Sequence, residues 1–549
     1  MATIETRPSA EQWAAAIIGD ISQAVAAGDL ARAQQLAGAA IMHGVRHPTC
    51  FNARGLWMQQ TGRHDLALED FQRALALKPN DPIILNAIAM SLLKLNRVPE
   101  AAKAIDAAIA ADPNNAQSHY RKGIVAATAG NHDVAQAAYE RAVEIDPNHA
   151  EATASLASIA ARKGEGDKSR ALAKRALELK PHQPTALLAE AIVDLGEKKY
   201  ADAEARLNRI LNEGYLYNEA RSAVLGLLGD AYDGQKRYAE AFATYCKENE
   251  ELRREHGHRF ANSRGADAAR NLIAYFESTP KDIWGPPDDG GSLPGAPTEH
   301  VFLLGFMRSG TTLLEQVLAS NPRIVALEEK GLLHGLGDVF MTSNLGLDAL
   351  AAIHGEELRR NRETYWQRVR NHGVDVAGKI FVDKQPLNTI KLPLIAKFFP
   401  KAKILFALRD PRDVVFSCFR RHFRINVTMF EFLDLADSAR FYASTMRLAE
   451  LYREKLQLDL FETRYEEIVS NFEEHVRALC RFIGVEWSDK MREFNKIAPN
   501  VDIRSPSATQ VRRPLYNEGM AQWRKYEKEL APILPILQPW VEKFGYPPA

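Results

Sequence analysis

The sequence predicts an all-α solenoid of stacked helix pairs, followed by an α/β domain with a central parallel sheet. In the first half, small and bulky residues recur every 34 positions. In the second half, short apolar runs alternate with amphipathic stretches, as strands and helices do in α/β folds. A segment rich in Pro and Gly separates the two patterns. We therefore expect the solenoid over residues 10–276, a linker over 277–298 and the α/β domain over 299–549.

The 34-residue spacing indicates a specific kind of helical repeat. It relates prolines that close one unit and start the next, and alanines where two antiparallel helices approach closely. Gly or Asn ends the first helix of most units in a left-handed conformation. The pattern resembles the tetratricopeptide repeat, with about six or seven units between residues 10 and 250. The resemblance implies that the assembled solenoid binds a protein partner or an extended peptide. The spaced prolines are Pro79, Pro113, Pro147 and Pro181.

Composition excludes several classes of protein. Lys plus Arg and Asp plus Glu both number 70, so net charge is zero and nucleic acid is not expected as a partner. Four scattered cysteines without a CxxC pair indicate neither a structural zinc site nor a disulfide framework. No apolar run approaches the roughly 18 residues of a membrane span, and the first residues lack a secretion signal. We expect a cytoplasmic protein without membrane contact.

The stretch LLGFMRSGTTLLE, Leu303 to Glu315, predicts an anion-binding loop between a buried strand and a helix. Gly305 and Gly310 have the spacing of a P-loop, but Thr311 stands where a nucleotide kinase or ATPase has its lysine. Backbone N–H groups at the start of the helix would bind the anion. A nucleotide end that carries one phosphate and one sulfate suits this loop. The residues expected to contact it are Arg308, Ser309, Gly310, Thr311 and Thr312.

A second stretch, Lys401 to Phe423, reads as a strand, a turn and a helix. Arg409 lies at the end of the strand and Ser417 lies on the helix, with Arg421 one turn further on the same face. Two arginines and a hydroxyl would bind a dianionic phosphate, whereas Arg409 alone could equally form a strand-end salt bridge. RSGTTLL resembles the 5′-phosphosulfate loop of sulfotransferases, and the Arg409/Ser417 pair resembles their 3′-phosphate motif. The resemblance implies a P-loop-like sulfotransferase domain that uses 3′-phosphoadenosine 5′-phosphosulfate (PAPS).

Within that family the motifs are most similar to those of the tyrosylprotein type. Aligned without gaps, Glu329 falls on the catalytic base, with Glu328 as the alternative, and Lys384 in VDKQP falls on the catalytic lysine. Tyr465 in TRYEEI matches a cofactor contact, and Ser507 in SATQV matches a serine that helps to stabilise the transition state. The resemblance thus implies that Glu329 takes the acceptor proton while Lys384 and Ser507 stabilise the leaving oxygen. Taken without the resemblance, Glu329 could be a solvated residue of a first helical turn, and Lys384 a surface lysine.

The chain departs from the tyrosylprotein pattern at several positions. Gln522 precedes Trp523 where those enzymes carry a cofactor-contacting lysine, and the nearest cations are Arg524 and Lys525. Their cysteines near the glutamate pair and near the catalytic lysine are absent here. The acceptor therefore stays open between a peptide tyrosine, a saccharide and a small molecule with a hydroxyl. No His, Cys or carboxylate cluster has the spacing of metal ligands, so no metal is expected.

The combination resembles a bacterial family of tetratricopeptide-repeat sulfotransferases. We therefore expect a PAPS-dependent enzyme whose solenoid binds a protein. Two other interpretations remain open. In the first, the chain is a non-catalytic tetratricopeptide scaffold with a relic nucleotide-binding domain. In the second, it is a P-loop nucleotide kinase, although Thr311 argues against this.

Overall fold

The computed structural model describes residues 9–212, 218–260, 264–285, 295–497 and 519–548. Contacts divide the chain into two compact units, Met1–Glu197 and Lys198–Ala549. This division follows packing. The boundaries expected from the repeat pattern, at 276 and 298, remain a proposal. In the described ranges, no helix combines the length and the apolar character that crossing a membrane requires. The cytoplasmic location remains a prediction.

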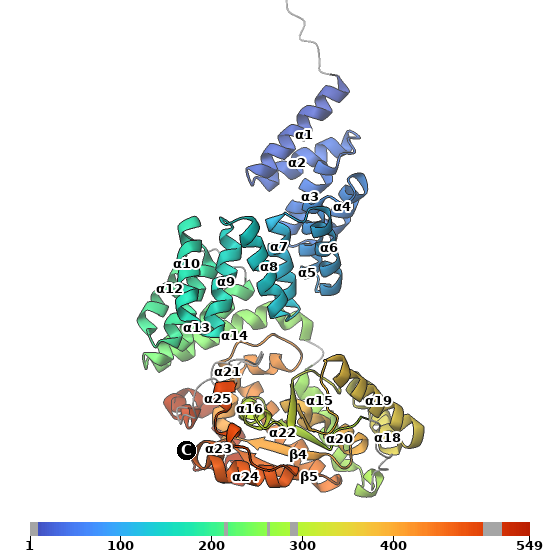
Figure 1. Cartoon of the computed structure of the whole chain (residues 1–549), viewed down its shortest axis with the longest axis vertical. Coiled ribbons are helices and arrows are strands. Elements are labelled where there is room, and N and C mark those ends of the chain that lie inside the picture. Colours follow the sequence, from blue (N-terminus) through green and yellow to red (C-terminus); the bar gives the residue numbers. More distant parts are fainter. Residues whose placement is uncertain (1–8, 213–217, 261–263, 286–294, 498–518, 549) are drawn as a thin grey trace, which may run out of the picture. The chain divides into compact units, whose positions relative to one another are not determined.

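The first unit consists of antiparallel helix pairs, coloured blue to teal in Figure 1. Its helices are α1 (Ala10–Ala26), α2 (Leu30–Met42), α3 (Pro48–Gln60), α4 (His64–Leu77), α5 (Pro82–Lys94), α6 (Val98–Ala111), α7 (Ala116–Thr128), α8 (His132–Ile145), α9 (Ala150–Lys163), α10 (Gly166–Leu179) and α11 (Pro184–Gly196).

The 34-residue pattern corresponds to stacked helix pairs, as the sequence predicts. The alanines of one ladder are at most 1% exposed, and the glycines between paired helices have positive φ, with Asn96 (φ 59°) taking the same conformation at its place in the series. Gly55 shows why a small residue is needed, because a Cβ there would lie 2.6 Å from Cε1 of Phe71. The predicted all-α solenoid is therefore confirmed. The alanines are Ala33, Ala67, Ala101 and Ala135.

The second unit begins with further helices and continues into the α/β domain. The helices before the sheet are α12 (Tyr200–Asn212), α13 (Asn218–Gly234), α14 (Tyr238–Phe260), α15 (Gly265–Ser278) and the 3₁₀ turn η1 (Lys281–Trp284). The pair α13–α14 keeps the repeat-type contact, since a Cβ at Gly229 would lie 2.4 Å from Cε1 of Tyr245. Helix α15 packs against α22 (Leu435–Lys455) of the same unit.

A five-stranded parallel sheet forms the centre of the α/β domain, as predicted. The strand order is β2-β3-β1-β4-β5. The strands are β1 (Glu299–Gly305), β2 (Ile324–Glu328), β3 (Ile380–Lys384), β4 (Lys403–Leu408) and β5 (Asp459–Arg464). All pairings are parallel, so the carboxyl ends of the strands share one edge. Ligands of open α/β sheets bind outside that edge.

Helices cover the sheet, and alternate strand residues face two separate apolar cores. Phe302 and Leu304 of β1 enter one core, while Val301 and Leu303 enter the other. The remaining elements are α16 (Thr311–Ala319), α17 (Leu336–Phe340), α18 (Asn344–Ala352), α19 (Gly355–Asn371), η2 (Pro386–Lys391), α20 (Leu392–Phe398), α21 (Pro411–Phe419), η3 (Met429–Leu433), α23 (Tyr465–Ser470), α24 (Phe472–Ile483), η4 (Asp489–Met491), α25 (Phe494–Ile497), η7 (Gln522–Tyr526), α27 (Glu527–Leu530), η8 (Ala531–Ile533) and α28 (Leu534–Lys543).

Candidate active site

The predicted anion-binding loop connects β1 to α16 and is tightly packed. Gly310 has a φ of 90° and precedes the first residue of α16. A Cβ at this position would lie 2.7 Å from Cδ2 of Tyr465, so only glycine fits both the conformation and the space. Arg308 also has a positive φ, 68°, which costs free energy in a residue other than glycine. Ser309, Thr311 and Thr312 are all buried in the turn and the first residues of α16.

The residues predicted to contact the donor come together from separate elements. Arg308 Nε donates to Ser417 Oγ at 3.0 Å, and Arg409 Nη1 donates to the Arg308 carbonyl at 3.1 Å. The Arg409 guanidinium also lies 4.7 Å from the centre of the Tyr465 ring. The loop, the end of β4, the helix α21 and the start of α23 therefore meet at one point. The sequence motifs assigned these residues to one donor, although Arg308 lies 109 residues from Ser417 and 101 from Arg409.

We call Arg308, Arg409, Arg420 and Arg421 the arginine cluster. Burial, together with the charges of Arg421 and Arg409, lowers the pKa of Arg308 to about 9. The Nε atoms of the other three arginines are buried without a hydrogen-bond partner among the described residues. Buried positive charge of this kind is stabilised by an anion, which the cluster would hold with charge-assisted hydrogen bonds.

Because α21 ends at Phe419, Arg421 does not lie on the helix face of Ser417, contrary to the prediction from its spacing. Its Nη1 lies 3.0 Å from Oδ2 of Asp230 on α13. Asp230 lies 191 residues earlier in the chain, so helix periodicity around Arg421 does not predict this contact. A role for Arg421 in binding the donor remains a proposal.

A second group of charges, the lysine–glutamate cluster, lies where β3 and β2 end. Lys384 Nζ lies 2.8 Å from Glu329 Oε1, 3.0 Å from Glu328 Oε1 and 3.3 Å from Glu315 Oε2. The lysine is fully buried, which excludes the alternative of a surface lysine. Burial alone would lower the pKa of Lys384, but the three carboxylates outweigh it and raise the pKa. The ammonium therefore stays charged at neutral pH.

Glu329 is held in an unusual backbone conformation. Its φ is 47°, and its N–H donates to the Lys384 carbonyl at 2.9 Å. It follows β2 directly and is not part of a helix, so the first-turn alternative does not hold. Such strained positions cluster at functional sites. Its side chain is 28% exposed, whereas that of Glu328 is 12% exposed, so Glu329 is the glutamate of the pair that solvent and an acceptor reach more easily.

Glu315 belongs to this cluster, and the sequence reasoning missed it. It lies on α16, is 3% exposed, and has its pKa raised to about 8 by burial. A usable signal was present in the sequence, since Glu315 is the one charged residue in the otherwise uncharged stretch TTLLEQVLAS. An isolated charge on a buried helix usually faces a partner.

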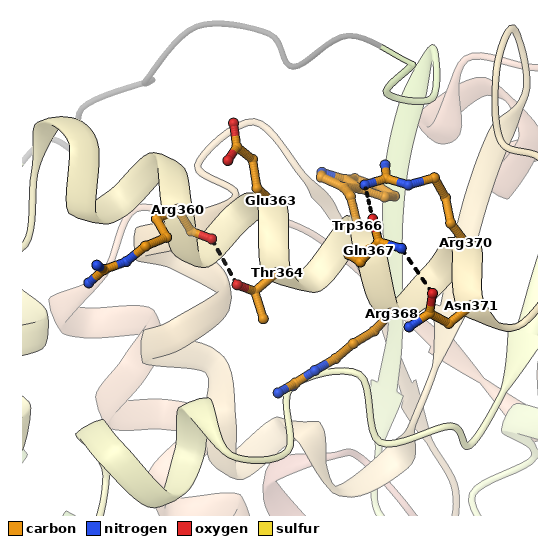
Figure 2. A pocket seen from close by; sticks show the side chains of 8 residues that line it. All are labelled: Arg360, Glu363, Thr364, Trp366, Gln367, Arg368, Arg370 and Asn371. Atoms are coloured by element: carbon orange, nitrogen blue, oxygen red, sulfur yellow. Dashed lines mark hydrogen bonds between the residues drawn. The ribbon is translucent and has the colours of Figure 1, made fainter.

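A surface hollow of about 550 Å³ opens beside Glu329. It is lined by Glu329, Lys330, Gly331, His334, Gly335 and Arg368. Arg368 reaches it from α19 and donates to the Leu332 carbonyl at 2.7 Å. Figure 2 shows a separate hollow on α19, where Gln367 forms hydrogen bonds to Arg370 and Asn371 at 2.9 Å each. Only the first of these two hollows includes a candidate catalytic side chain.

Ser507, and the neighbouring Ser505, lie outside the described residues, and the predicted role of Ser507 remains a prediction. Gln522 stands where the tyrosylprotein enzymes carry a lysine, and its Oε1 accepts a hydrogen bond from Lys525 Nζ at 2.8 Å. The adjacent Trp523 is 1% exposed. In the described part of the chain, no group of three His, Cys, Asp or Glu side chains has an arrangement that could hold a metal ion.

Comparison with known proteins agrees with both halves of the fold. Residues 300–489 match the Sulfotransferase family, and residues 86–148 and 120–184 match the tetratricopeptide repeat. An uncharacterized protein of Aquifex aeolicus is 26% identical over 379 residues, which are 66% of this chain and 47% of the relative. Protein-tyrosine sulfotransferase 1 of Danio rerio is 24% identical over 262 residues, which are 45% of this chain and 72% of the relative.

Among solved structures, a tetratricopeptide repeat protein from Parabacteroides merdae is 17% identical, with a TM-score of 0.34, over 43% of this chain and 93% of that chain. The chain spans about half the length of the Aquifex relative, and more of the Danio enzyme. The chain thus combines an all-α solenoid with a domain built on a five-stranded parallel sheet, and these parts match the tetratricopeptide repeat and the Sulfotransferase family, respectively.

Proposed function

We propose that the protein is a sulfotransferase that moves a sulfuryl group from PAPS to an acceptor hydroxyl. The observation that carries the proposal is the placement of two charged clusters at the same edge of the parallel sheet. β1 and β4 lead into Arg308 and Arg409, while β3 and β2 lead into Lys384 and Glu329. An anion-binding site and an acid–base pair are what transfer of an anionic group to a hydroxyl requires.

The arginine cluster fits the donor. Ser417 and the guanidinium groups of Arg409 and Arg421 would hold the 3′-phosphate, and Arg308 with the backbone of the loop would hold the 5′-phosphosulfate. The buried guanidinium nitrogens without partners support this assignment, because an anion would satisfy them. Tyr465 would close the site from the side of α23. Bound there, PAPS would supply an activated sulfuryl group.

The lysine–glutamate cluster would accept the proton of the acceptor and stabilise the negative charge that develops on the leaving oxygen. Glu329 would take the proton of the acceptor hydroxyl, which requires a carboxylate within hydrogen-bond reach of that oxygen. The Lys384 ammonium, released from Glu329, would donate to the oxygen that gains negative charge as the sulfuryl group leaves. Ser507 would donate to the same oxygen. Glu315 and Glu328 would keep the ammonium in place throughout.

The acceptor site would be the hollow beside Glu329. The relatives named protein-tyrosine sulfotransferases favour a peptide tyrosine as acceptor, while a saccharide or a small molecule remains compatible with the chemistry. The tetratricopeptide repeats would bind a protein partner, as such solenoids commonly do.

Calorimetry with adenosine 3′,5′-bisphosphate, the product of the donor, tests the proposal. We expect micromolar binding without Mg²⁺, and release of this product from PAPS when a tyrosine peptide, a saccharide or a phenol serves as acceptor. Binding of ATP with Mg²⁺ in place of the bisphosphate would support the nucleotide kinase. Binding of neither would support the non-catalytic scaffold.

A further inference from the structure

Helix α21, which carries Ser417, ends against the helix pair α13–α14. Asn249 on α14 donates from Nδ2 to the carbonyl of Phe419 at 2.9 Å. This carbonyl belongs to the last residue of α21, where backbone oxygens have no partner within the helix. Asn249 is 3% exposed, so water cannot replace it easily. The end of the donor-binding helix is therefore capped by a side chain from the helical segment before the sheet.

The three residues that follow α21 each face a different carboxylate of the same helix pair. Arg420 and Arg421 face α13, and His422 faces α14. The nitrogen–oxygen distances are 3.8 Å for Arg420 and Asp233, 3.0 Å for Arg421 and Asp230, and 2.8 Å for His422 and Glu248. Two arginines and a histidine that follow one another, each facing its own carboxylate, leave this turn little freedom to move.

Burial makes the contact between the end of α21 and the helix pair α13–α14 costly in free energy to rearrange. Glu248 is 1% exposed, and burial raises the pKa of its carboxyl group. Phe242 of α14 stacks on Phe419 with ring centres 5.7 Å apart. Asp233 also accepts a hydrogen bond from Tyr526 of η7 at 2.5 Å. Separating the two surfaces would expose apolar rings and strip paired charges of their partners.

We propose that α13 and α14 are part of the donor site, because they position the end of α21 so that Ser417 and Arg421 can bind the 3′-phosphate. Asn249 and Glu248 are positioning residues in this view and do not contact the donor themselves. A helix pair with repeat-type packing within the second unit would thereby set the affinity of the sheet domain for its donor. The inference rests on the proposed function, since it assumes that Ser417 faces the 3′-phosphate.

The test compares two nucleotides that differ only in the 3′-phosphate. Calorimetry gives the affinities of adenosine 3′,5′-bisphosphate and adenosine 5′-monophosphate for the full chain, well below its unfolding temperature. We expect Asn249→Ala to reduce the preference for the bisphosphate by about tenfold and to leave the weaker monophosphate binding unchanged. A purely structural role of Asn249 would lower the unfolding temperature without changing this ratio.

Arg447→Ala is the matched control. Arg447 lies 3.0 Å from Glu277 and joins α22 to α15, so it also connects the helical segment to the sheet domain, but without α21. In the Arg447→Ala variant, the ratio of the two nucleotide affinities should equal that of the wild type. Glu248→Gln provides a second variant of the contact, with a smaller loss of preference expected, and decides the matter if Asn249→Ala does not fold.

The outcomes separate the two proposals. A wild type without preference for the bisphosphate would overturn the proposed function. If the wild type prefers the bisphosphate and the folded Asn249→Ala and Glu248→Gln variants keep this preference in full, the proposed function stands. Only the role of α13 and α14 is then overturned.

Discussion

The two charged clusters lie at the same edge of one sheet but are neutralised to different degrees. In the arginine cluster, buried guanidinium nitrogens have no hydrogen-bond partner among the described residues. In the lysine–glutamate cluster, Lys384 Nζ lies within 3.3 Å of three carboxylates. In the first arrangement Asp230 and Asp233 face two of the arginines, but buried N–H donors remain that an anion from outside can satisfy. The second arrangement supplies all of its counter-charges from its own glutamates. The comparison indicates that donor binding and proton transfer are separate tasks, so each should be removable without the other.

The largest effect is expected from Lys384→Met, which removes the only cation of the lysine–glutamate cluster. Glu315 would then have no counter-charge and would have to keep its proton, so at pH values above its wild-type pKa of about 8 the free energy of unfolding should fall by about 3–5 kcal/mol. Turnover should be lost as well. The double variant Lys384→Met/Glu315→Gln should recover much of the stability but no activity. Denaturant unfolding measures the stability, and a sulfuryl-transfer assay measures the turnover. Recovered activity in the double variant would contradict the role of Lys384.

Glu329→Gln should reduce turnover by about 10²–10⁴-fold, because the acceptor hydroxyl loses its base. The affinity for adenosine 3′,5′-bisphosphate should stay unchanged, since the arginine cluster is intact. Glu328→Gln is the matched control and should keep most of the activity. The reverse result, with turnover lost only in Glu328→Gln, would assign the base to Glu328.

Arg409→Ala should weaken binding of adenosine 3′,5′-bisphosphate by about 1.5–3 kcal/mol, the usual contribution of a hydrogen bond to a charged group. Arg409→Lys should recover part of this loss, because it restores the charge but not the planar guanidinium. The free energy of unfolding should change less than in Lys384→Met. Calorimetry without Mg²⁺ measures the affinity, and an unchanged value would place the 3′-phosphate elsewhere.

At pH 5 the smallest effect is expected from Glu315→Gln, and this effect grows as pH rises. Burial raises the pKa of Glu315 to about 8 from an ordinary value of 4.5, so the folded protein keeps a proton that the unfolded chain releases between these values. Wild-type stability therefore falls as pH rises through this window. Glutamine cannot titrate, so the variant should gain stability relative to wild type by up to about 1.4 kcal/mol per pH unit. Unfolding at pH 5, 6 and 7 measures the difference, and a gap independent of pH would show that Glu315 does not titrate there.

Local pattern explains which parts of this site could be predicted. The segment from β1 through the loop to α16 is continuous in sequence, so glycine spacing and hydroxyl positions predicted its shape. Arg409 and Ser417 follow from the same logic on β4 and α21. The role of Ser507 depends on residues outside the described ranges and stays a prediction.

The sequence by itself determined the helix pairs, through a 34-residue period that requires small residues at close contacts, and the parallel sheet with its anion-binding loop. Only the tertiary structure decided that Glu315 faces Lys384, that Asp230 pairs with Arg421 and that Asn249 caps α21. The physical reason is the separation in sequence between the residues that interact. Periodicity and turn chemistry act over a few residues, whereas these contacts join side chains separated by 69 to 191 positions, whose meeting depends on how whole elements pack.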